Sequence, residues 1–426
     1  MTAIDPTTTV SADDPTAERP TATDLFLRLP RWARGLVYAV VPILVLAIAR
    51  EMTGADQLTS ANTVSSALKL SMPIALAGLG GLWSERAGIV NIGLEGMMVL
   101  GTWFGAYGAI AYGPWTGVLM GVLGGALGGL LHAVATVTFG VDHIISGVAI
   151  NLLAVGLTDF LTTTTTSWGN ATKESPPIPS NVVDLDLIPF LKGPLQDLSN
   201  QNRFFLSDVA RILLGLTTGV SILIVIGLAM FAVTGYVLWR TRFGLRLRSV
   251  GEDPDAADSL GVRVYSLKYA ATIMSGALSG LGGVLLVYLF AEKFQSQQTN
   301  GRGFIGLAAM IFGNWRPGGL IAGAGLFGFM DSMQSQVNET AHALLVVTAL
   351  LFVLVALRLA LRSQWRSAAI LVVLAIGSYV WYQNTDELPV EFIPYFPHFT
   401  TLLVLVFASQ RLRMPSADGK IWRRSG

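Results

Sequence analysis

The feature that most constrains the fold of this chain is a series of apolar segments separated by short polar connections. A helix needs about 20 apolar residues to cross the hydrocarbon core of a bilayer, because each residue rises about 1.5 Å. The candidate segments are 36–49, 64–83, 94–112, 115–139, 144–163, 210–238, 269–291, 304–313, 319–333, 342–357, 367–383 and 398–409. Of these, 304–313 and 398–409 are too short to cross a bilayer alone.

The composition agrees with a membrane protein. Charged residues make up 13% of the chain, whereas about a quarter is usual for a soluble domain. We therefore expect an all-α polytopic membrane protein, a bundle of about 8–12 transmembrane or half-spanning helices, with a short cytoplasmic helix. The chain has no cysteine, which excludes disulfides and thiol nucleophiles, and its four histidines lack metal-ligand spacing.

Basic residues predict the topology. Arg28, Arg31 and Arg34 precede the first apolar segment, which places the N-terminus inside by the positive-inside rule. Alternating sides from this start then places the other basic groups inside as well. These groups are Arg86, Arg240 to Lys268, Arg358, Arg362, Arg366, Arg411, Arg413, Lys420, Arg423 and Arg424. We expect both termini to be cytoplasmic.

The apolar segments and the alternation of sides also predict the domain organisation. Residues 1–30 form a disordered cytoplasmic N-terminal tail without the features of a cleavable signal peptide, 31–410 a transmembrane domain, and 411–426 a cytoplasmic C-terminal tail. An outside loop covers about 164–208 and a cytoplasmic loop about 239–268. The outside loop either caps the outer mouth, seats an external partner, or is passive.

A polar stretch from Glu252 to Val262 interrupts the apolar chain. Asp253 is a candidate N-cap, Pro254 a first-turn proline, and Gly261 a residue that ends a helix. This pattern predicts a cytoplasmic helix of about two turns. A passive connector and a docking element both fit the pattern.

Polar residues also occur within or beside the apolar segments, where they are expensive and therefore candidates for function. The stretches 84–96 and 301–319 combine glycine or proline with polar side chains, as in the broken helices that line transport pathways. The general candidates are Asn91, Glu95, Asn151, Asp159 and Asp331. The tentative substrate pathway is Asn91, Glu95, Asn151 and Asn314. The alternative is that several of them, Glu95 among them, lie at the membrane interface.

Several chemistries lack their motifs. The chain contains no GxxxxGK[ST] phosphate loop, HExxH or GxSxG, so we expect no catalytic residue and no ATP hydrolysis in this chain. Glycines at four-residue spacing predict close helix packing rather than a site. These pairs are Gly121 and Gly125, Gly124 and Gly128, Gly125 and Gly129, Gly276 and Gly280, and Gly319 and Gly323.

Four stretches resemble one family. They are ERAGIVNIGLEGMMVLG (85–101), VDHIISGVAINLL (141–153), GEDPDAADSLGV (251–262) and GRGFIGLAAMIFGNWRPGG (301–319). Together they resemble permeases of type II ABC importers in the ribose and branched-chain amino acid superfamily, nearest to its nucleoside and simple-sugar branch. MPSADGK (414–420) extends the likeness more weakly. Aspartate at Asp255 departs from the glutamate usual in the family's coupling motif.

The resemblance implies a multi-pass subunit of the bacterial plasma membrane that transports nucleosides or related simple sugars. Its partners would be an ATP-binding cassette ATPase, a second permease, usually a paralogue, an extracytoplasmic substrate-binding lipoprotein and membrane lipid, with no nucleic acid. The ATPase would bind ATP and Mg, and this chain would hold no cofactor or metal. The implied ATPase-coupling residues are Glu252, Asp253, Pro254, Asp255, Ala256, Ala257, Leu260 and Gly261.

Two other classes remain as alternatives. An ion-coupled secondary transporter would use membrane carboxylates such as Glu95 or Asp331, and an intramembrane enzyme would need a site assembled from distant residues. For the coupling helix we expect that a bulky charged residue at Ala257 abolishes uptake but leaves folding intact, because Ala257 is small and lies in the presumed docking helix.

Overall fold

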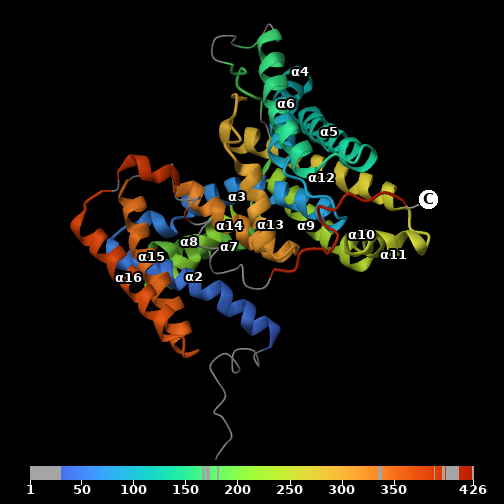
Figure 1. The fold of residues 1–426 in the computed structure, drawn as a ribbon. Helices are drawn as coiled ribbons and strands as arrows, with labels where there is room; N and C mark the ends of the chain where they lie inside the picture. Colours follow the sequence, from blue (N-terminus) through green and yellow to red (C-terminus); the bar gives the residue numbers. More distant parts are fainter. Residues whose placement is uncertain are drawn as a thin grey trace, which may run out of the picture. The chain divides into compact units, whose positions relative to one another are not determined.

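A computed structural model describes most of the chain (Figure 1). It describes residues 30–165, 168, 173–179, 182–333, 338–387, 389–395, 399 and 412–424. The predicted N-terminal tail, 1–30, and the short apolar segment 398–409 therefore lie almost entirely outside the described residues. The chain divides into two units, one from Met1–Ala55 and His342–Asp386 and one from Asp56–Ala341 and Glu387–Gly426.

The first unit is built from three apolar helices. These are α2 (Arg31–Thr53), most of α15 (Asn338–Ala360) and α16 (Trp365–Asn384). The helices α15 and α16 form a hairpin, in which the Ser378 hydroxyl donates to the Leu345 carbonyl at 2.8 Å. At the far end, His342 Nε2 and Thr385 Oγ1 lie 2.9 Å apart. None of the predicted pathway or coupling residues lies in this unit.

The second unit contains the remaining elements. Its helices are η1 (Asp56–Thr59), α3 (Ala61–Arg86), α4 (Leu94–Tyr112), α5 (Pro114–Ala133), η2 (Val134–Thr138), α6 (His143–Thr164), α7 (Pro189–Asn200), α8 (Leu206–Thr217), α9 (Ile222–Arg240), α10 (Arg242–Glu252), α11 (Pro254–Ser259), α12 (Val264–Leu286), η3 (Val287–Ala291), α13 (Arg302–Phe312), α14 (Pro317–Met333) and η4 (Val390–Tyr395). Two short strands, β1 (Asp184–Leu185) and β2 (Val220–Ser221), pair antiparallel.

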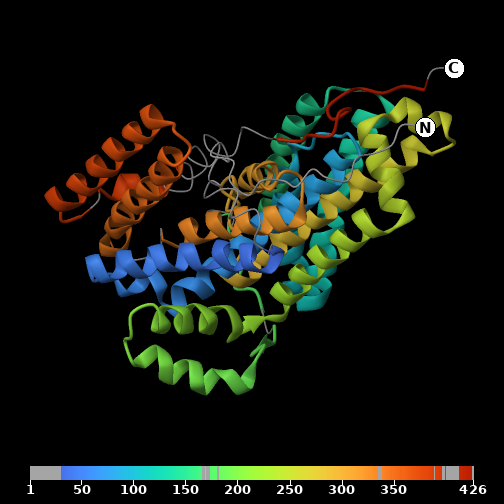
Figure 2. The same ribbon diagram turned by 90° about the horizontal axis from the view of Figure 1, so that it is seen from below.

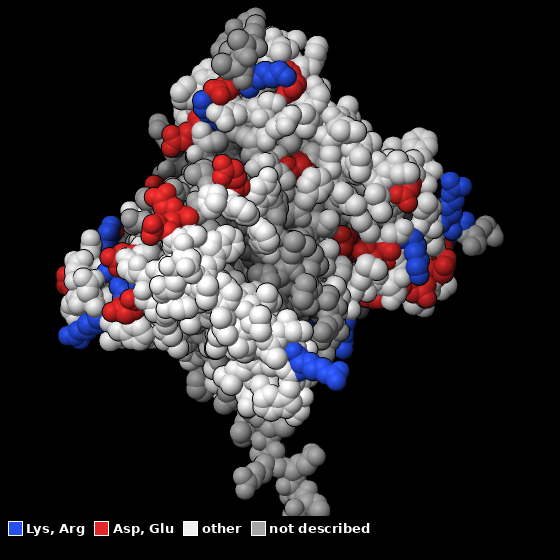
Figure 3. Space-filling model, turned by 60° about the vertical axis from the view of Figure 1, so that its left-hand side comes forward, with Lys and Arg blue, Asp and Glu red and all other residues white. Residues whose placement is uncertain are grey.

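Within the described residues, eight helices are long and apolar enough to cross a membrane. They come from α2, α3, α5 with η2, α6, α9, α12 with η3, α15 and α16. Broad surfaces without charged side chains are visible in the space-filling view (Figure 3). On α5 the exposed large side chains are Trp115, Leu119, Leu123, Leu127, Leu130 and Leu131. This face suits lipid or another membrane helix, and the chain is an all-α polytopic membrane protein, as predicted.

The core of the second unit forms where α3, α4, α5 and α12 pack together. The glycines at four-residue spacing allow the close approach of α5 and α12. A Cβ on Gly125 would lie 2.3 Å from the Gly276 carbonyl oxygen, and one on Gly280 would lie 2.5 Å from the Gly121 carbonyl oxygen. Side chains at these positions would push the helices apart, so the predicted packing role of the glycines is confirmed here.

The predicted span 210–238 is wrong, because the chain breaks in its middle. Residues up to Thr217 belong to α8, Gly219 has a φ of +61°, and α9 begins only at Ile222. The cause is tertiary: the Asp208 carboxylate is fully buried and accepts a 2.6 Å hydrogen bond from Thr59, which holds α8 beside the start of α3.

The predicted outside loop 164–208 contains ordered structure. It holds β1 and α7, and α7 packs side by side with α8, visible as the green pair in Figure 2. The short segment 304–313 corresponds to α13, whose 11 residues extend about 16 Å. This helix is too short to cross a bilayer alone, as predicted.

Candidate functional site

The connection between α3 and α4 is formed by residues 87–93, which we name the polar loop after Asn91, its one polar side chain. Two histidines from neighbouring helices hold its middle residue, Val90. His132 Nε2 donates to the Val90 carbonyl at 3.0 Å, and the Val90 N–H donates to His143 Nδ1 at 3.3 Å. In this tautomer His132 Nδ1 accepts from the Ser146 hydroxyl at 2.9 Å. Both histidines therefore position the backbone of Val90. The sequence did not indicate this role, because they are far from the loop along the chain.

Asn91 is completely buried in this loop. Its side-chain amide donates to the Ser275 hydroxyl of α12 at 2.8 Å and contacts the Met97 sulfur at 3.4 Å. Its Oδ1 atom is buried without a hydrogen-bond partner. Since a buried polar atom without a partner is rare, Asn91 Oδ1 is an acceptor available to a solute or water.

Glu95 lies at the start of α4, and its carboxylate caps the start of α13. Its Oε1 accepts from the Gly301 N–H at 2.9 Å and its Oε2 from the Gly303 N–H at 2.6 Å. These N–H groups have no partner within α13, and the positive end of the helix dipole favours a carboxylate there. A Cβ on Gly303 would lie 2.6 Å from Glu95 Cα, so glycine is required for this approach.

Asn151 of α6 connects to the same region. It donates to the Ile92 carbonyl at 3.1 Å and accepts from the Gly96 N–H at 2.7 Å. The structure thus brings the predicted residues Asn91, Glu95 and Asn151 together around residues 91–96. The polar capacity of Asn151 is directed to the backbone, which makes it a residue that positions the loop.

The fourth predicted pathway residue, Asn314, lies elsewhere. It occupies the turn between α13 and α14 with a φ of +53°, and its Oδ1 accepts from the Arg413 N–H at 2.8 Å. The neighbouring Trp315 binds the end of α3: its indole donates to Glu85 at 2.6 Å, and its carbonyl accepts from Arg86 at 2.7 Å. Asn314 is therefore separated from Glu95 by the length of α13, about 16 Å.

The two remaining acidic candidates have basic partners. Asp331 on α14 forms an ion pair with Arg302 at 2.7 Å, and both side chains are almost completely buried. Asp159 at the end of α6 accepts from Lys173 at 2.7 Å and from Ser296 at 2.5 Å. Arg302 was not singled out from the sequence, because nothing local shows that an arginine 29 residues away faces Asp331.

The coupling stretch forms the predicted capped helix. In α11, the Asp253 side chain accepts from the Ala256 N–H at 3.0 Å, Pro254 is the first helical residue, and Gly261 has a φ of +78°. The helix has six residues, slightly fewer than the two turns predicted.

The exposed face of α11 differs from the face predicted by residue size. The Ala257 side chain is 3% exposed and packs against Val250, Val264 and Leu267, so it seats α11 on the permease itself. By contrast, the Leu260 side chain is 84% exposed. The expectation that a bulky charged residue at Ala257 leaves folding intact therefore does not fit the structure.

The C-terminal segment 412–424 lies against α11, which sequence reasoning did not foresee. Ser416 donates to Glu252 through its N–H at 3.2 Å and its hydroxyl at 3.1 Å. The Trp422 indole donates to Asp255 at 2.7 Å, and Arg424 pairs with Asp258 at 3.0 Å. Three of the four acidic residues in 252–258 thus bind this segment, and the basic character of the tail was the available signal.

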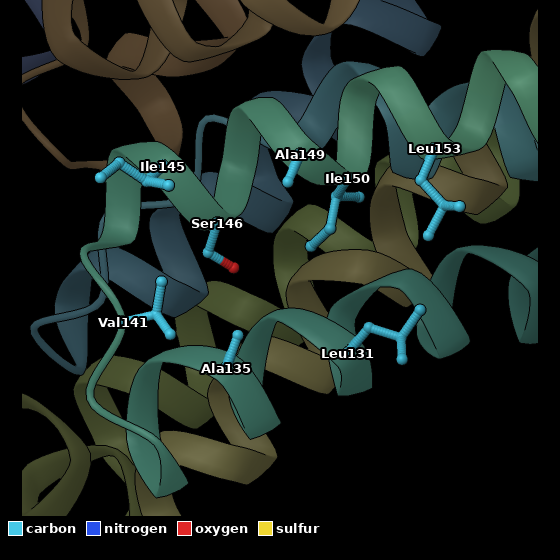
Figure 4. A pocket seen from close by; sticks show the side chains of 8 residues that line it. All are labelled: Leu131, Ala135, Val141, Ile145, Ser146, Ala149, Ile150 and Leu153. Atoms are coloured by element: carbon cyan, nitrogen blue, oxygen red, sulfur yellow. The ribbon is translucent and has the colours of Figure 1, made fainter.

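A separate apolar groove of about 280 Å³ lies between α5, η2 and α6 (Figure 4). Its lining residues are Leu131, Ala135, Val141, Ile145, Ser146, Ala149, Ile150 and Leu153. Ser146 is the single polar member, and its hydroxyl is bonded to His132. The groove therefore lacks the convergent polar groups expected of a site for a polar solute.

The comparisons with known proteins agree with this arrangement. Residues 63–356 match the family described as the permease component of branched-chain amino acid transport systems. The chain is 36% identical over 280 residues to a guanosine ABC transporter permease of Bacillus subtilis, covering 63% of this chain and 81% of that one. No solved structure matches the chain.

Two further relatives point the same way. A nucleoside ABC transporter permease of Lactococcus lactis is 37% identical over 285 residues, covering 63% of this chain and 81% of the relative. A putative glucose ABC transporter permease of Haloferax volcanii is 30% identical over 292 residues, covering 67% and 80%. The matched region includes the polar loop, α11 and α13, and the chain therefore belongs to the permease family of branched-chain amino acid transport systems.

Proposed function

We propose that this chain is the permease subunit of an ATP-binding cassette importer and forms part of the pathway for nucleosides or related simple sugars. The observation that carries the proposal is the 36% and 37% identity to guanosine and nucleoside permeases, over 280 and 285 residues. The family match over residues 63–356 contains both the polar loop and α11. The importer would lie in a bacterial plasma membrane with both termini of this chain in the cytoplasm, in agreement with the distribution of basic residues.

The geometry of α11 supports coupling to a separate ATPase. This short helix is capped at its own start and seated on the permease through Ala257, yet it exposes Leu260 almost fully. We assign this exposed side chain to an apolar contact with the ATPase. ATP and Mg would be bound by that partner, and ATP-driven closure would displace α11.

The charge state of the loop region supports a neutral solute. The positive end of α13 is a natural site for a carboxylate or phosphate, but the Glu95 carboxylate already occupies it. A second anion there would meet repulsion from Glu95. Nucleosides and simple sugars carry no such charge, so the arrangement favours them over nucleotides or acidic solutes.

The available polar groups suit the same solutes. Asn91 Oδ1 is a buried acceptor without a partner, and it faces the region between the polar loop and α12. Sugar hydroxyls and base N–H groups are donors that match an amide oxygen. We assign Asn91 a direct role in the pathway, whereas Asn151 and Glu95 shape it.

The ion-coupled alternative receives less support. A carboxylate that binds and releases a proton or sodium ion must be able to exchange partners, but Asp331 is held by Arg302 and Glu95 by two backbone N–H groups. The relatives named above are ABC permeases rather than secondary transporters.

The complete importer would contain a second permease, an ATPase and a substrate-binding lipoprotein. The test is uptake of labelled guanosine, adenosine and glucose by proteoliposomes that contain all subunits, with and without ATP inside. We expect uptake that requires internal ATP and persists with an ionophore. Uptake without ATP that collapses with the ionophore would contradict the proposal, and the ranking of the three solutes would name the substrate.

A further inference from the structure

We propose that the C-terminal segment 412–424 is a brace that carries displacement of α11 to the polar loop 87–93 and to the turn between α13 and α14. This role rests on the proposed function, because it concerns how movement imposed on α11 reaches the pathway. The segment is named the C-terminal brace below.

The first observation is the density of contacts between the brace and α11. Trp422 supplies the strongest of them. Its indole N–H bonds to the Asp255 carboxylate at 2.7 Å, its ring lies 5.1 Å from that of Tyr265, and it packs on the apolar seat of Ala257. A hydrogen bond to a charged acceptor is stronger than one between neutral groups, and the ring packing adds to it. The Arg424 to Asp258 pair at 3.0 Å is a second contact, in which the Arg424 side chain is 67% exposed and the Asp258 side chain 24%.

The second observation is that the other end of the brace contacts the connections that lead to the pathway. The Ala417 N–H donates to the Gly251 carbonyl at 2.9 Å, where α10 meets α11. The Ala417 carbonyl lies so close to the polar loop that a Cβ on Gly88 would be 3.2 Å from it. The Arg413 N–H donates to Asn314 in the turn between α13 and α14.

The middle of the brace is buried beside a second carboxyl group. Asp418 is 8% exposed and lies next to Glu85 at the end of α3, with Lys268 and Arg86 nearby. Glu85 in turn accepts from the Trp315 indole. The brace is thus inserted between α3, α12 and Trp315 rather than laid on their surface.

The brace gives α11 a second connection to the permease besides the contact of Ala257 with Val250, Val264 and Leu267. A helix of six residues is too short to be stable without such tertiary contacts. The brace ties α11 directly to the polar loop and to Asn314. Through the polar loop it reaches Asn91 and Glu95, so movement at the cytoplasmic face would change the geometry at the start of α13.

The first experiment asks whether the brace stays attached during transport. The chain contains no cysteine, so the double variant Glu252→Cys and Ser416→Cys can be joined by a short thiol cross-linker in the complete reconstituted importer. These two side chains meet at 3.1 Å and are exposed to reagent. Because the substitutions themselves remove the bond between Glu252 and Ser416, the reference is the same double variant before cross-linking, and we expect cross-linking to leave the ATP-driven uptake of that variant unchanged or to raise it. Loss of uptake that returns on cleavage of the linker would overturn the proposal, because the brace would then have to detach.

The second experiment separates a brace from a passive tail. In Trp422→Ala combined with Arg424→Ala, ATP hydrolysis should continue while solute imported per ATP falls about fivefold or more, the lower end of usual coupling between sites. Lys420→Ala is the matched control, because Lys420 is exposed on the same segment and its side chain makes no hydrogen bond or ion pair within the described part of the chain. An unchanged ratio in the double variant would overturn the proposal.

Two further variants exclude a simple folding defect. Trp422→Phe keeps the ring but loses the bond to Asp255, and should fall between wild type and the double variant. The charge reversal of Asp258→Arg with Arg424→Asp should recover more coupling than Asp258→Arg alone.

Absence of ATP-driven uptake in wild type would instead refute the proposed function. Hydrogen exchange of the full-length chain still tests the brace in that case: Trp422→Ala should increase exchange both in α11 and in residues 87–93, and an increase in α11 alone would overturn it.

Discussion

Glu95 and Gly303, 208 positions apart in the chain, meet so that a carboxylate oxygen lies 2.6 Å from a backbone N–H. This contact joins the start of α4 to the start of α13. It explains how the short helix α13 can begin inside the protein. The carboxylate accepts from N–H groups that would otherwise be buried without partners.

The absence of a side chain at Gly303 should be essential. Gly303→Ala would place a methyl group 2.6 Å from Glu95 Cα, and such overpacking costs about 1–3 kcal/mol. We expect a lower unfolding temperature in detergent and reduced uptake. The matched control is Gly318→Ala, since a Cβ on Gly318 meets nothing within 4 Å. Equal stability of the two variants would contradict the close approach.

The charge of Glu95 should determine which solutes compete. Glu95→Gln keeps one acceptor for the start of α13, loses the other because its NH2 group then meets an N–H donor, and removes the negative charge, so repulsion of a bound anion is lost. We expect nucleoside monophosphates to inhibit nucleoside uptake more strongly in this variant than in wild type, measured with the same binding protein. Identical inhibition in both would mean that Glu95 does not set charge selectivity.

The pair of Arg302 and Asp331 should depend on both members. Asp331→Ala leaves a buried guanidinium without its carboxylate, and breaking a buried pair in this way costs about 3–5 kcal/mol. Replacing both, as Arg302→Met with Asp331→Leu, should recover most of the lost stability because no charge remains buried. Thermal unfolding in detergent measures both variants. A double variant as unstable as Asp331→Ala would show that the pair does more than balance charge.

The two alanines of α11 should respond differently to a charged substitution. Ala257→Glu places a carboxylate in a buried seat and should destabilise α11 and the whole chain, whereas Ala256→Glu lies on the exposed side and should leave folding unchanged. Co-purification with the ATPase and thermal unfolding are the measurements. We expect Ala256→Glu to weaken ATPase binding without changing the unfolding temperature. The reverse pattern would mean that α11 presents its other face.

Attachment of the C-terminal brace should weaken as pH rises. Burial raises the pKa of Asp418 from 3.8 to about 7, although Lys268 and Arg86 oppose the shift. The attached brace therefore holds more protons than the detached one between about pH 4 and about pH 7, and its attachment is strongest at the acidic end of this window. Protease protection of residues 412–424 should fall between pH 5 and pH 8 in wild type. Asp418→Asn, which cannot ionise, should remove that dependence, and a persistent dependence would assign it to another group.

Much of this molecule follows from local patterns. The length and composition of the apolar segments indicate a multi-pass helical membrane protein, and Asp253, Pro254 and Gly261 mark the bounds of α11 within about one residue. Such features depend on neighbours within one or two helical turns, so a single sequence contains them. The likeness of four motifs to one permease family was also present in the sequence, and the family match confirms it.

The sequence does not contain the pairing of distant side chains. The packing of helices far apart in the chain decides which carboxylate caps α13 and which arginine pairs with Asp331. It also decides which face of α11 is buried, namely the one that carries Ala257. The break at Gly219 shows the same limit, because an apolar count continues through it and tertiary contacts such as the buried bond between Thr59 and Asp208 hold α8 beside α3. The sequence by itself therefore determined the class of protein and the bounds of most helices. The tertiary structure alone decided the site, because its contacts join segments that no local period relates.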